Sequence, residues 1–269
     1  MKRGKLGFTL IEVAIFLAIT GALFAGVMVG VQNSIYQQKT NDSVQSFVEF
    51  LRTAYAGVTD VQNTAGGRSE KAIYGKLITF GESRDLAGER VDGNNEIFVY
   101  TVIGDTGDSN GKGTFEALKA LNASITRVVT NEEGENVIEL AGIAESYLPK
   151  WAAEIEPPCD GESLASCEFR PVKGMMLILR HPNSGTVTTF WSDELVEVND
   201  LLRRIRLGDN VAVDVFEKIF NVQQIDFCIN TTGESNVFNR MDVRVLKGSK
   251  NASGIELIGN GTDGYRCGS

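Results

Sequence analysis

The sequence predicts an α+β fold: a long N-terminal α-helix, transmembrane in its first half, packed on an antiparallel β-sheet with an inserted loop and helix region. Two observations lead to this prediction. An apolar stretch over residues 8–31 is followed by a proline-free helical periodicity that continues to about residue 63. Residues 64–269 then contain short, apolar, β-branched segments separated by turn residues. A helix that is amphipathic in its second half needs an apolar partner, and a sheet provides one.

Composition indicates a folded, acidic protein. The 269 residues are 42% hydrophobic and 23% charged, and the formal net charge is -9. A protein that neutralises phosphates would usually be basic, so general nucleic-acid binding by the whole chain is disfavoured. The single histidine, His181, lies in the turn-like run RHPNSG, which favours a turn-packing role over a catalytic one. P-loop and HExxH motifs are absent, and the sequence predicts neither an enzyme nor a cofactor.

Residues 8–31 are the most apolar part of the chain. These 24 residues would span about 36 Å as a helix, enough to cross a hydrocarbon core of about 30 Å. Glu12 is the only charge in this stretch, and Lys2, Arg3 and Lys5 precede it. Basic flanks stay in the cytoplasm, so we expect a single-pass protein of the cytoplasmic (inner) membrane with its C-terminal domain outside the cytoplasm.

Three interpretations of this N-terminal stretch compete. A cleavable secretory signal has a shorter apolar region of about 7–15 residues, no carboxylate near its start, and a small-x-small cleavage site. A plain signal anchor explains the length but not Glu12, since a carboxylate costs about 2.5–3.5 kcal/mol near a helix centre. A leader that is removed on the cytoplasmic side accounts for both features, and the residues around Gly7 favour it.

The run GFTLIEV, residues 7–13, resembles the class III leader of type IV prepilins and pseudopilins. The resemblance covers about the first 30 residues. It implies that residues 1–7 are a leader peptide, that prepilin peptidase cuts after Gly7, and that the new N-terminal Phe8 is N-methylated. It also implies that residues 8–31 form a transmembrane helix that later becomes part of a filament core.

In this resemblance Phe8 and Glu12 carry assembly and register. The N-terminal ammonium of Phe8 and the carboxylate of Glu12 would both be costly in lipid or in a dry filament core unless they were paired. Glu12 of one subunit can meet the ammonium of a neighbour, as one polar residue sets register in a coiled coil. The implied partners are other pilin subunits, prepilin peptidase, an inner-membrane assembly platform, and membrane lipid before assembly.

The apolar stretch departs from the family pattern in one respect. Most such helices carry a proline in mid-segment, whereas Gly21, Gly26 and Gly30 occur here. Glycines could permit local stretching or close helix contacts, and we favour helix packing.

Residues 32–63 continue the helix as its amphipathic half. Apolar residues recur at spacings of three and four, which is typical of one helical face. They are Val44, Phe47, Leu51, Ala54, Val58 and Val61. The whole predicted helix, residues 8–63, is about 80 Å long.

The globular part, residues 64–269, is predicted as one pilin-like α+β domain with an insertion at about 104–170, and two separate lobes are the alternative. Strands are expected at 72–80 and 96–104, a hairpin at 175–181 and 186–191, and three closing antiparallel strands at 222–230, 241–247 and 254–258. Weaker helical patterns occur at 114–123 and 193–206.

Four cysteines, Cys159, Cys167, Cys228 and Cys267, lie in the part expected outside the cytoplasm, where disulfides persist. Three pairings are possible. Pairing 159 with 167 and 228 with 267 gives a local loop and a bond that ties the tail to a strand. The second bond resembles the C-terminal disulfide loop that pilins often carry. The CxxC spacing of zinc sites is absent, and no metal site is predicted.

Two further features have a functional and a plain interpretation. The loop at 104–113 offers Asp105, Asp108 and Asn110 as calcium ligands, but it lacks the EF-hand spacing, so a solvated turn is favoured. A basic cluster near the C-terminus resembles the DNA-contacting patch of some minor pilins. It contains Arg240, Arg244, Lys247 and Lys250. Interleaved acidic residues weaken its field, which favours ordinary charged strand faces.

The resemblance therefore implies a structural subunit of a type IV pilus-like filament. The globular part is large for a major pilin, so a minor pilin or a pseudopilin fits better. The alternative is a DNA-capturing minor pilin of a natural-transformation pilus. The sequence leaves open whether the subunit serves an adhesive or twitching pilus, DNA uptake, or type II secretion.

Overall fold

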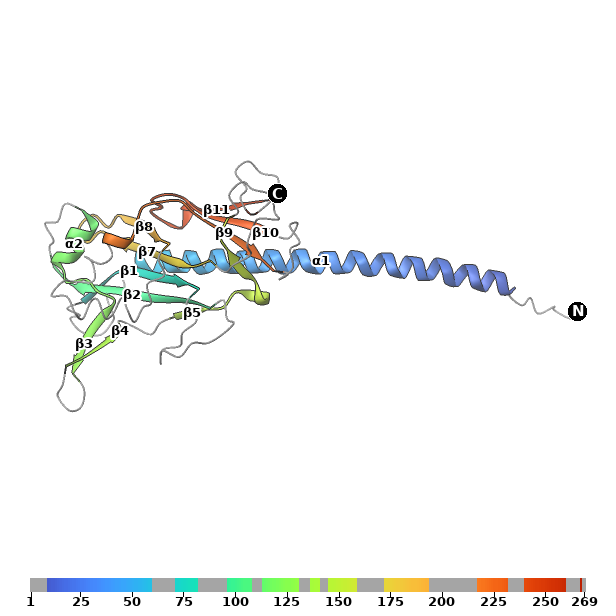
Figure 1. The fold of residues 1–269 in the computed structure, drawn as a ribbon, viewed down its shortest axis with the longest axis horizontal. Coiled ribbons are helices and arrows are strands. Elements are labelled where there is room, and N and C mark those ends of the chain that lie inside the picture. Colours follow the sequence, from blue (N-terminus) through green and yellow to red (C-terminus); the bar gives the residue numbers. More distant parts are fainter. Residues whose placement is uncertain are drawn as a thin grey trace, which may run out of the picture.

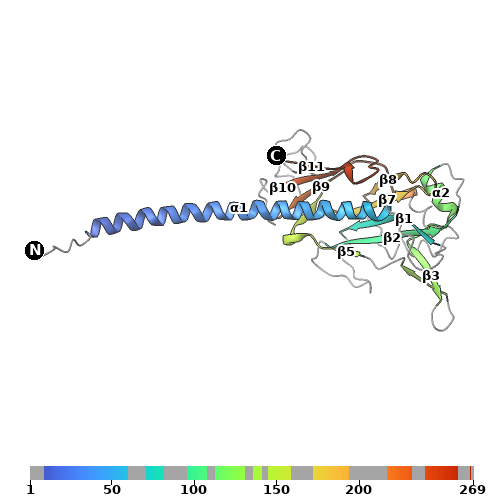
Figure 2. The ribbon, with the colours of Figure 1, turned by 180° about the vertical axis from the view of Figure 1, so that it is seen from behind.

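The fold is described by a computed structural model over residues 9–59, 71–81, 96–107, 113–130, 136–140, 145–158, 172–193, 217–231, 240–259 and 267. Within these ranges a long N-terminal helix, α1, packs on antiparallel sheets, which confirms the predicted α+β class (Figure 1). The first half of α1 extends away from the domain, and the second half lies against it in both opposite views (Figure 1 and Figure 2).

Helix α1 runs unbroken over Leu10–Thr59, 50 residues and about 75 Å. It contains no proline, and Gly21, Gly26 and Gly30 lie within it without interrupting the helix. The predicted single helix is therefore confirmed over this range. Residues 8 and 60–63, the ends of the predicted helix, lie outside the described residues.

The larger sheet has five strands in the order β5-β2-β1-β7-β8, with every described neighbour antiparallel. Its strands are β1 (Lys71–Phe80), β2 (Ile97–Asp105), β5 (Glu145–Tyr147), β7 (Gly174–Arg180) and β8 (Val187–Ser192). The predicted strands at 72–80 and 96–104 and the predicted hairpin are confirmed to within a residue at most ends. Residues 181–186 connect β7 to β8, as the turn-like run around His181 indicates.

The second sheet has four strands in the order β11-β10-β9-β6. They are β6 (Glu154–Glu156), β9 (Ile225–Asn230), β10 (Arg240–Val245) and β11 (Ile255–Ile258). The three closing antiparallel strands of the sequence prediction are confirmed, although β9 begins at Ile225 rather than at residue 222. The single predicted sheet is thus two sheets, both in contact with α1.

The segment expected as an insertion, residues 104–170, contributes strands to both sheets. Strand β5 pairs with β2, and β6 pairs with β9. The same segment holds helix α2 (Thr114–Ala120), a separate hairpin of β3 (Thr126–Thr130) and β4 (Asn136–Leu140), and the 3₁₀ turn η1 (Lys150–Ala152). The helix predicted at 114–123 is confirmed over Thr114–Ala120. The helix expected at 193–206 lies almost entirely outside the described residues.

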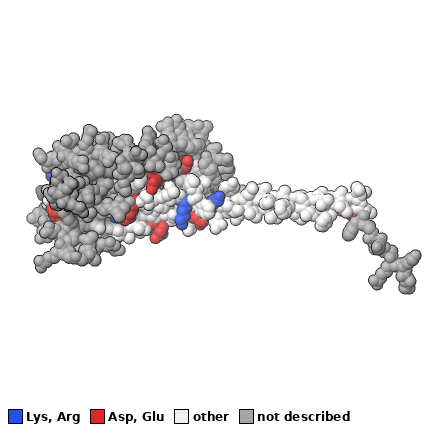
Figure 3. Space-filling view, turned by 90° about the horizontal axis from the view of Figure 1, so that it is seen from below, with Lys and Arg blue, Asp and Glu red and all other residues white. Residues whose placement is uncertain are grey.

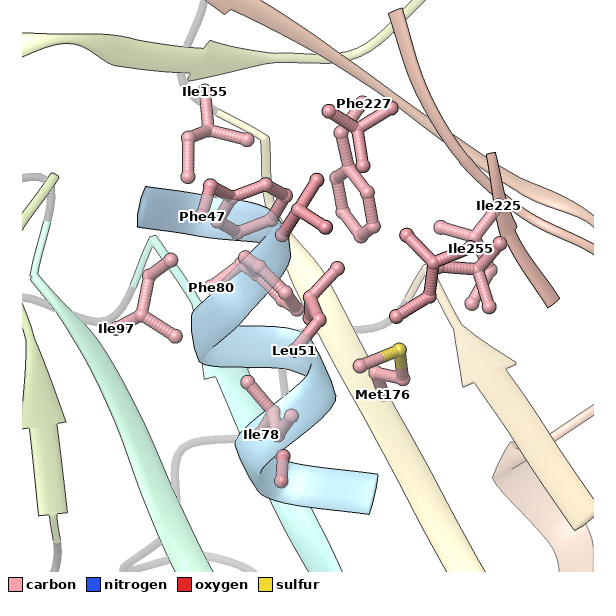
Figure 4. Packing of buried hydrophobic residues seen from close by; sticks show 14 of the residues in the cluster. Phe47, Leu51, Ile78, Phe80, Ile97, Ile155, Met176, Ile225, Phe227 and Ile255 are labelled. Atoms are coloured by element: carbon pink, nitrogen blue, oxygen red, sulfur yellow. The ribbon is translucent and has the colours of Figure 1, made fainter. Parts of the chain in front are cut away.

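The main core lies between the second half of α1 and both sheets. Five of the six apolar residues predicted to form one face of the helix are buried, and the sixth, Val61, lies outside the described residues. Phe47 packs edge-on against Phe227 of β9 at 5.4 Å between ring centroids, and Phe80 of β1 lies 5.0 Å from the same ring. Figure 4 shows Phe47 and Leu51 directed into this cluster from the helix. The aromatic contacts join the helix and the two sheets into one core.

Tyr55 adds a polar anchor to this core. Its buried hydroxyl forms a hydrogen bond with the Thr189 hydroxyl on β8, which in turn donates to the carbonyl oxygen of Ser249 at 3.1 Å. Burial raises the pKa of the Tyr55 phenol, so the group stays neutral in the hydrogen-bonded chain. The interaction fixes α1 to two segments that are distant in the sequence.

The opposite face of the five-stranded sheet is also covered. A second apolar cluster there joins Leu118 of α2 to Leu77 of β1, Leu177 of β7 and Phe190 of β8. A strand that is buried on both faces carries apolar residues at successive positions rather than alternately. This explains the continuous apolar sequence of β7, GMMLILR.

The four-stranded sheet carries a disulfide on the face that points away from α1. Phe227 and Ile229 of β9 enter the main core, so Cys228 between them points to the other face. Cys228 bonds Cys267, with 5.3 Å between their Cα atoms and a sequence separation of 39. This confirms the predicted bond between the tail and a strand. Cys159 and Cys167 lie outside the described residues.

Replacing Cys228 and Cys267 together by serine should lower the free energy of unfolding by about 4 kcal/mol, because the bond restricts a loop of 39 residues in the unfolded chain. Urea unfolding of the full chain in detergent, followed by tryptophan fluorescence, measures the change. The double variant keeps Cys159 and Cys167, so its comparison with the parent chain isolates this bond. An unchanged urea midpoint would contradict the prediction.

Candidate assembly and membrane helix

The first half of α1 makes no packing contact with the part of the domain that the structure describes. Apart from Asn33, whose side chain is not described, every residue from 10 to 38 is exposed. Fifteen of these exposed side chains are large and apolar: Leu10, Ile11, Val13, Ile15, Phe16, Leu17, Ile19, Leu23, Phe24, Val27, Met28, Val29, Val31, Ile35 and Tyr36. They surround the helix, and Figure 3 shows no charged surface along it between the domain and the region of its tip.

This segment is long and apolar enough to cross a membrane. The stretch that meets this criterion has none of its residues buried in the described structure, which distinguishes it from the core helix of a globular domain. The polar side chain within it, Thr20, donates its hydroxyl proton to the carbonyl oxygen of Phe16 at 2.7 Å. An intrahelical bond of this kind removes the hydrogen-bonding need of a hydroxyl in lipid.

The transition from exposed to buried helix occurs within one turn. Lys39 is half-buried and Thr40 is only 4% exposed. The Thr40 hydroxyl lies 2.7 Å from the hydroxyl of Thr231, and Ser43 donates to the carbonyl oxygen of Lys150 at 2.9 Å. These bonds fix the direction in which the apolar half leaves the domain.

Glu12 lies at the free tip of the helix in a capping box with Thr9. The Glu12 carboxylate accepts from the Thr9 backbone N–H at 2.9 Å and from the Thr9 hydroxyl at 3.0 Å. In return, the Glu12 N–H donates to the Thr9 Oγ1 at 3.3 Å. Sequence reasoning missed this pair, although Thr followed three residues later by Glu before an apolar run is its recognised signature.

The tip therefore carries an exposed carboxylate at the N-terminal end of the helix dipole. Gly7 and Phe8, the predicted cleavage and methylation residues, lie outside the described residues, so the structure does not place Phe8 relative to Glu12. Among the described residues, nothing beyond the neighbouring helix backbone lies within 4 Å of where a side chain would begin at Gly21, Gly26 or Gly30. These glycines are available for close contact with another helix.

The C-terminal basic cluster is only partly available for a ligand. Arg244 contacts Asp226 on β9 through Nε and Asp242 on its own strand through Nη2 at 3.3 Å, and its side chain is 13% exposed. Strand register places these groups together, because Arg244 is opposite Asp226 and Asp242 precedes it by two positions on the same face. Lys247 and Lys250 are exposed, and the side chain of Arg240 is not described.

The other sequence candidates have local roles where they are described. The Nδ1 atom of His181 accepts from the backbone N–H groups of Asn183 and Ser184, both at 3.2 Å, which shapes the β7–β8 turn. Asp105 accepts from the side-chain amide of Asn122 at 2.7 Å. Asp108 and Asn110 lie outside the described residues. Among the residues that the structure does describe, no group of three His, Cys, Asp or Glu side chains is arranged to hold a metal ion.

Comparison with known proteins identified no relative of this chain. The chain matches no protein-family model, no curated protein and no solved structure at a significant level. A long N-terminal apolar helix over antiparallel sheets is compatible with a pilin-like fold.

Replacing Arg244 by glutamine should destabilise the domain by about 3–5 kcal/mol, because two buried carboxylates would lose their guanidinium partner. The matched control is Lys247→Gln on the exposed surface, which should change the unfolding free energy by no more than about 0.5 kcal/mol. Urea unfolding of the full chain measures both. Equal stability of the two variants, together with salt-dependent DNA binding lost only in R244Q, would instead favour a nucleic-acid role for Arg244.

Proposed function

We propose that this chain is a structural subunit of a type IV pilus-like filament, either a minor pilin or a pseudopilin. It is inserted as a single-pass membrane precursor, processed by prepilin peptidase after Gly7, and assembled through the first half of α1. The observation that carries the proposal is Glu12, an exposed carboxylate at the tip of α1. Residues 13–38, which follow it, carry no charge, and the helix then continues without a break into the domain core.

The exposed apolar helix needs a nonpolar environment. Its fifteen large side chains are 45–87% exposed, so covering them would contribute on the order of 20 kcal/mol. A lipid bilayer provides this cover for a single chain, and neighbouring helices provide it in a filament. The same surface therefore suits both storage in the membrane and polymerisation.

The continuity of α1 supports an assembly role over a simple anchor. A lipid anchor can be joined to its domain by a flexible linker, whereas here the membrane segment and the core stripe belong to one helix. Any contact that orients the apolar half also orients the domain. A filament in which helices pack centrally and domains lie outside requires this rigid connection.

Glu12 supports the proposed register mechanism. A carboxylate in a packed helix bundle needs a partner, and the processed N-terminus of a neighbouring subunit supplies an ammonium. The capping box gives Glu12 a second, intramolecular role in the same chain. Pairing with a neighbour requires the charge of Glu12, whereas capping requires its hydrogen bonds with Thr9. Substitutions at the two positions therefore separate the two roles.

The DNA-capturing alternative has less support. Arg244, a central member of the basic cluster, is already held by Asp226 and Asp242. The proposal accordingly gives the chain a structural role with no cofactor, and its partners are other subunits, the peptidase and the assembly platform.

Gly7→Val should block processing, because the leader resemblance places the scissile bond after Gly7. Intact-mass spectrometry of the chain from cells that carry a prepilin peptidase should show a product lacking residues 1–7 for the parent and none for the variant. Gly4→Val, in the same leader, is the matched control and should be processed normally. A Gly7→Val chain that still begins at Phe8 would refute the assignment.

Glu12→Gln and Thr9→Ala should affect filament incorporation differently. Glutamine keeps the capping geometry but removes the charge, whereas alanine removes the cap, at a cost of about 1 kcal/mol, and keeps the charge. If Glu12 pairs with a neighbour's ammonium, E12Q should enter the membrane yet be lost from sheared filaments, and T9A should incorporate. Immunoblots of membrane and filament fractions measure this. The reverse pattern would mean that Glu12 acts only as a cap.

A further inference from the structure

Aromatic and basic side chains gather where α1 leaves the domain. The ammonium of Lys39 lies 5.9 Å from the ring centroid of Tyr36 on the same helix and 5.4 Å from that of Trp151 in η1. Both distances are within the range of cation–π contacts. Figure 3 shows basic surface at this junction, with acidic surface beside it, and no basic surface along the helix beyond it.

The η1 turn holds Trp151 outward. Trp151 and Ala152 have left-handed backbone conformations, with φ of 59° and 51°, which are uncommon for residues other than glycine. The turn is fixed because the Lys150 carbonyl accepts from Ser43 at 2.9 Å and from the Ala153 N–H at 3.1 Å, while Ala153 is buried. Trp151 stays 54% exposed and Leu148, just before the turn, 60% exposed. Two large apolar side chains, Leu148 and Trp151, are thus exposed on the surface rather than buried.

The position of this pair along the helix matches the edge of a bilayer. A hydrocarbon core of about 30 Å takes about 20 helical residues, which from Val13 reaches Gln32. Tyr36 and Lys39 then lie about 6 Å and 10 Å beyond the core. Helical side chains point toward the N-terminus, so the Tyr36 ring and the Lys39 ammonium reach back into the headgroup layer.

We propose that Tyr36, Lys39, Leu148 and Trp151 form an interfacial collar that docks the domain on the outer surface of a bilayer containing anionic phospholipid. Tryptophan and tyrosine favour the membrane interface, and lysine pairs there with lipid phosphates. Lys150 adds a second positive charge. The hollow that Lys150 lines also contains the acidic residues Asp42 and Glu49 and the basic residue Arg52, all on α1. The collar continues the lipid-facing surface of the helix directly, which favours lipid over a second protein chain as its partner.

The collar gives η1 a role that the filament proposal leaves unexplained. It sets the depth of the helix and seats the domain against the membrane before assembly. This inference rests on the membrane insertion in the proposed function and is independent of whether the chain forms filaments.

The two tryptophans of the chain provide the test. Trp191 is 5% exposed, whereas Trp151 lies in the collar. The full chain is reconstituted in vesicles of phosphatidylcholine and phosphatidylglycerol whose acyl chains are brominated near the headgroup, and its fluorescence is compared with that in unbrominated vesicles. W191F reports Trp151 alone, and W151F reports Trp191 alone as the matched control. If W191F does not fold, the difference in emission between the parent chain and W151F gives the Trp151 signal.

The expected result is a blue-shifted Trp151 emission that loses most of its intensity in brominated vesicles, with the Trp191 emission unchanged. A Trp151 emission typical of water and insensitive to bromine, in chains that resist alkaline extraction from the vesicles, would overturn the collar and leave the membrane helix intact. Chains that alkaline extraction releases would overturn both the collar and the membrane part of the proposed function.

Discussion

One unbroken helix has a buried half and an exposed apolar half, and the rest of the structure depends on this constraint. The second half of α1 buries one face of the helix between two sheets. The first half is apolar on every side and contacts none of the described residues of the domain. The change occurs at Lys39 and Thr40, where a hydroxyl pair with Thr231 marks the edge of the domain. The two sheets pack against the buried half, and their aromatic residues contact it.

Much of the fold could be predicted because its signals are local. The spacing of Val44, Phe47 and Leu51 defines a helical face whatever the fold around it, and the apolar run of β7 is long enough to indicate a buried strand. The strands β5 and β6 have three residues each and no alternation to detect. They are strands because β2 and β9 offer free edges, a fact that depends on distant pairing. The division into two sheets has the same non-local origin.

In the candidate site, too, features set by neighbouring residues could be predicted, and features set by distant residues could not. The exposure and position of Glu12 follow from the apolar run around it, and the Thr9 cap had a visible sequence signature. Arg244 looked like part of a basic surface because its partner Asp226 is 18 residues away and meets it only through strand register. The exposed position of Trp151 could not be predicted. It depends on a left-handed backbone conformation, which a segment without glycine does not indicate.

The unsupported length of α1 has a mechanical consequence. From Thr40 to Glu12 the helix extends about 42 Å beyond its last buried contact, so a tilt of one degree at the domain edge moves the Glu12 carboxylate by about 0.7 Å. An ion pair tolerates about half an ångström before its hydrogen bonds lengthen appreciably. For the proposed Glu12 ion pair, the tilt of α1 at the domain edge would have to be held to within about 0.7 degrees. The Thr40–Thr231 and Ser43–Lys150 hydrogen bonds are the contacts that hold it. Small changes in these distant hydroxyl contacts would therefore produce larger displacements at Glu12, the residue proposed to align subunits.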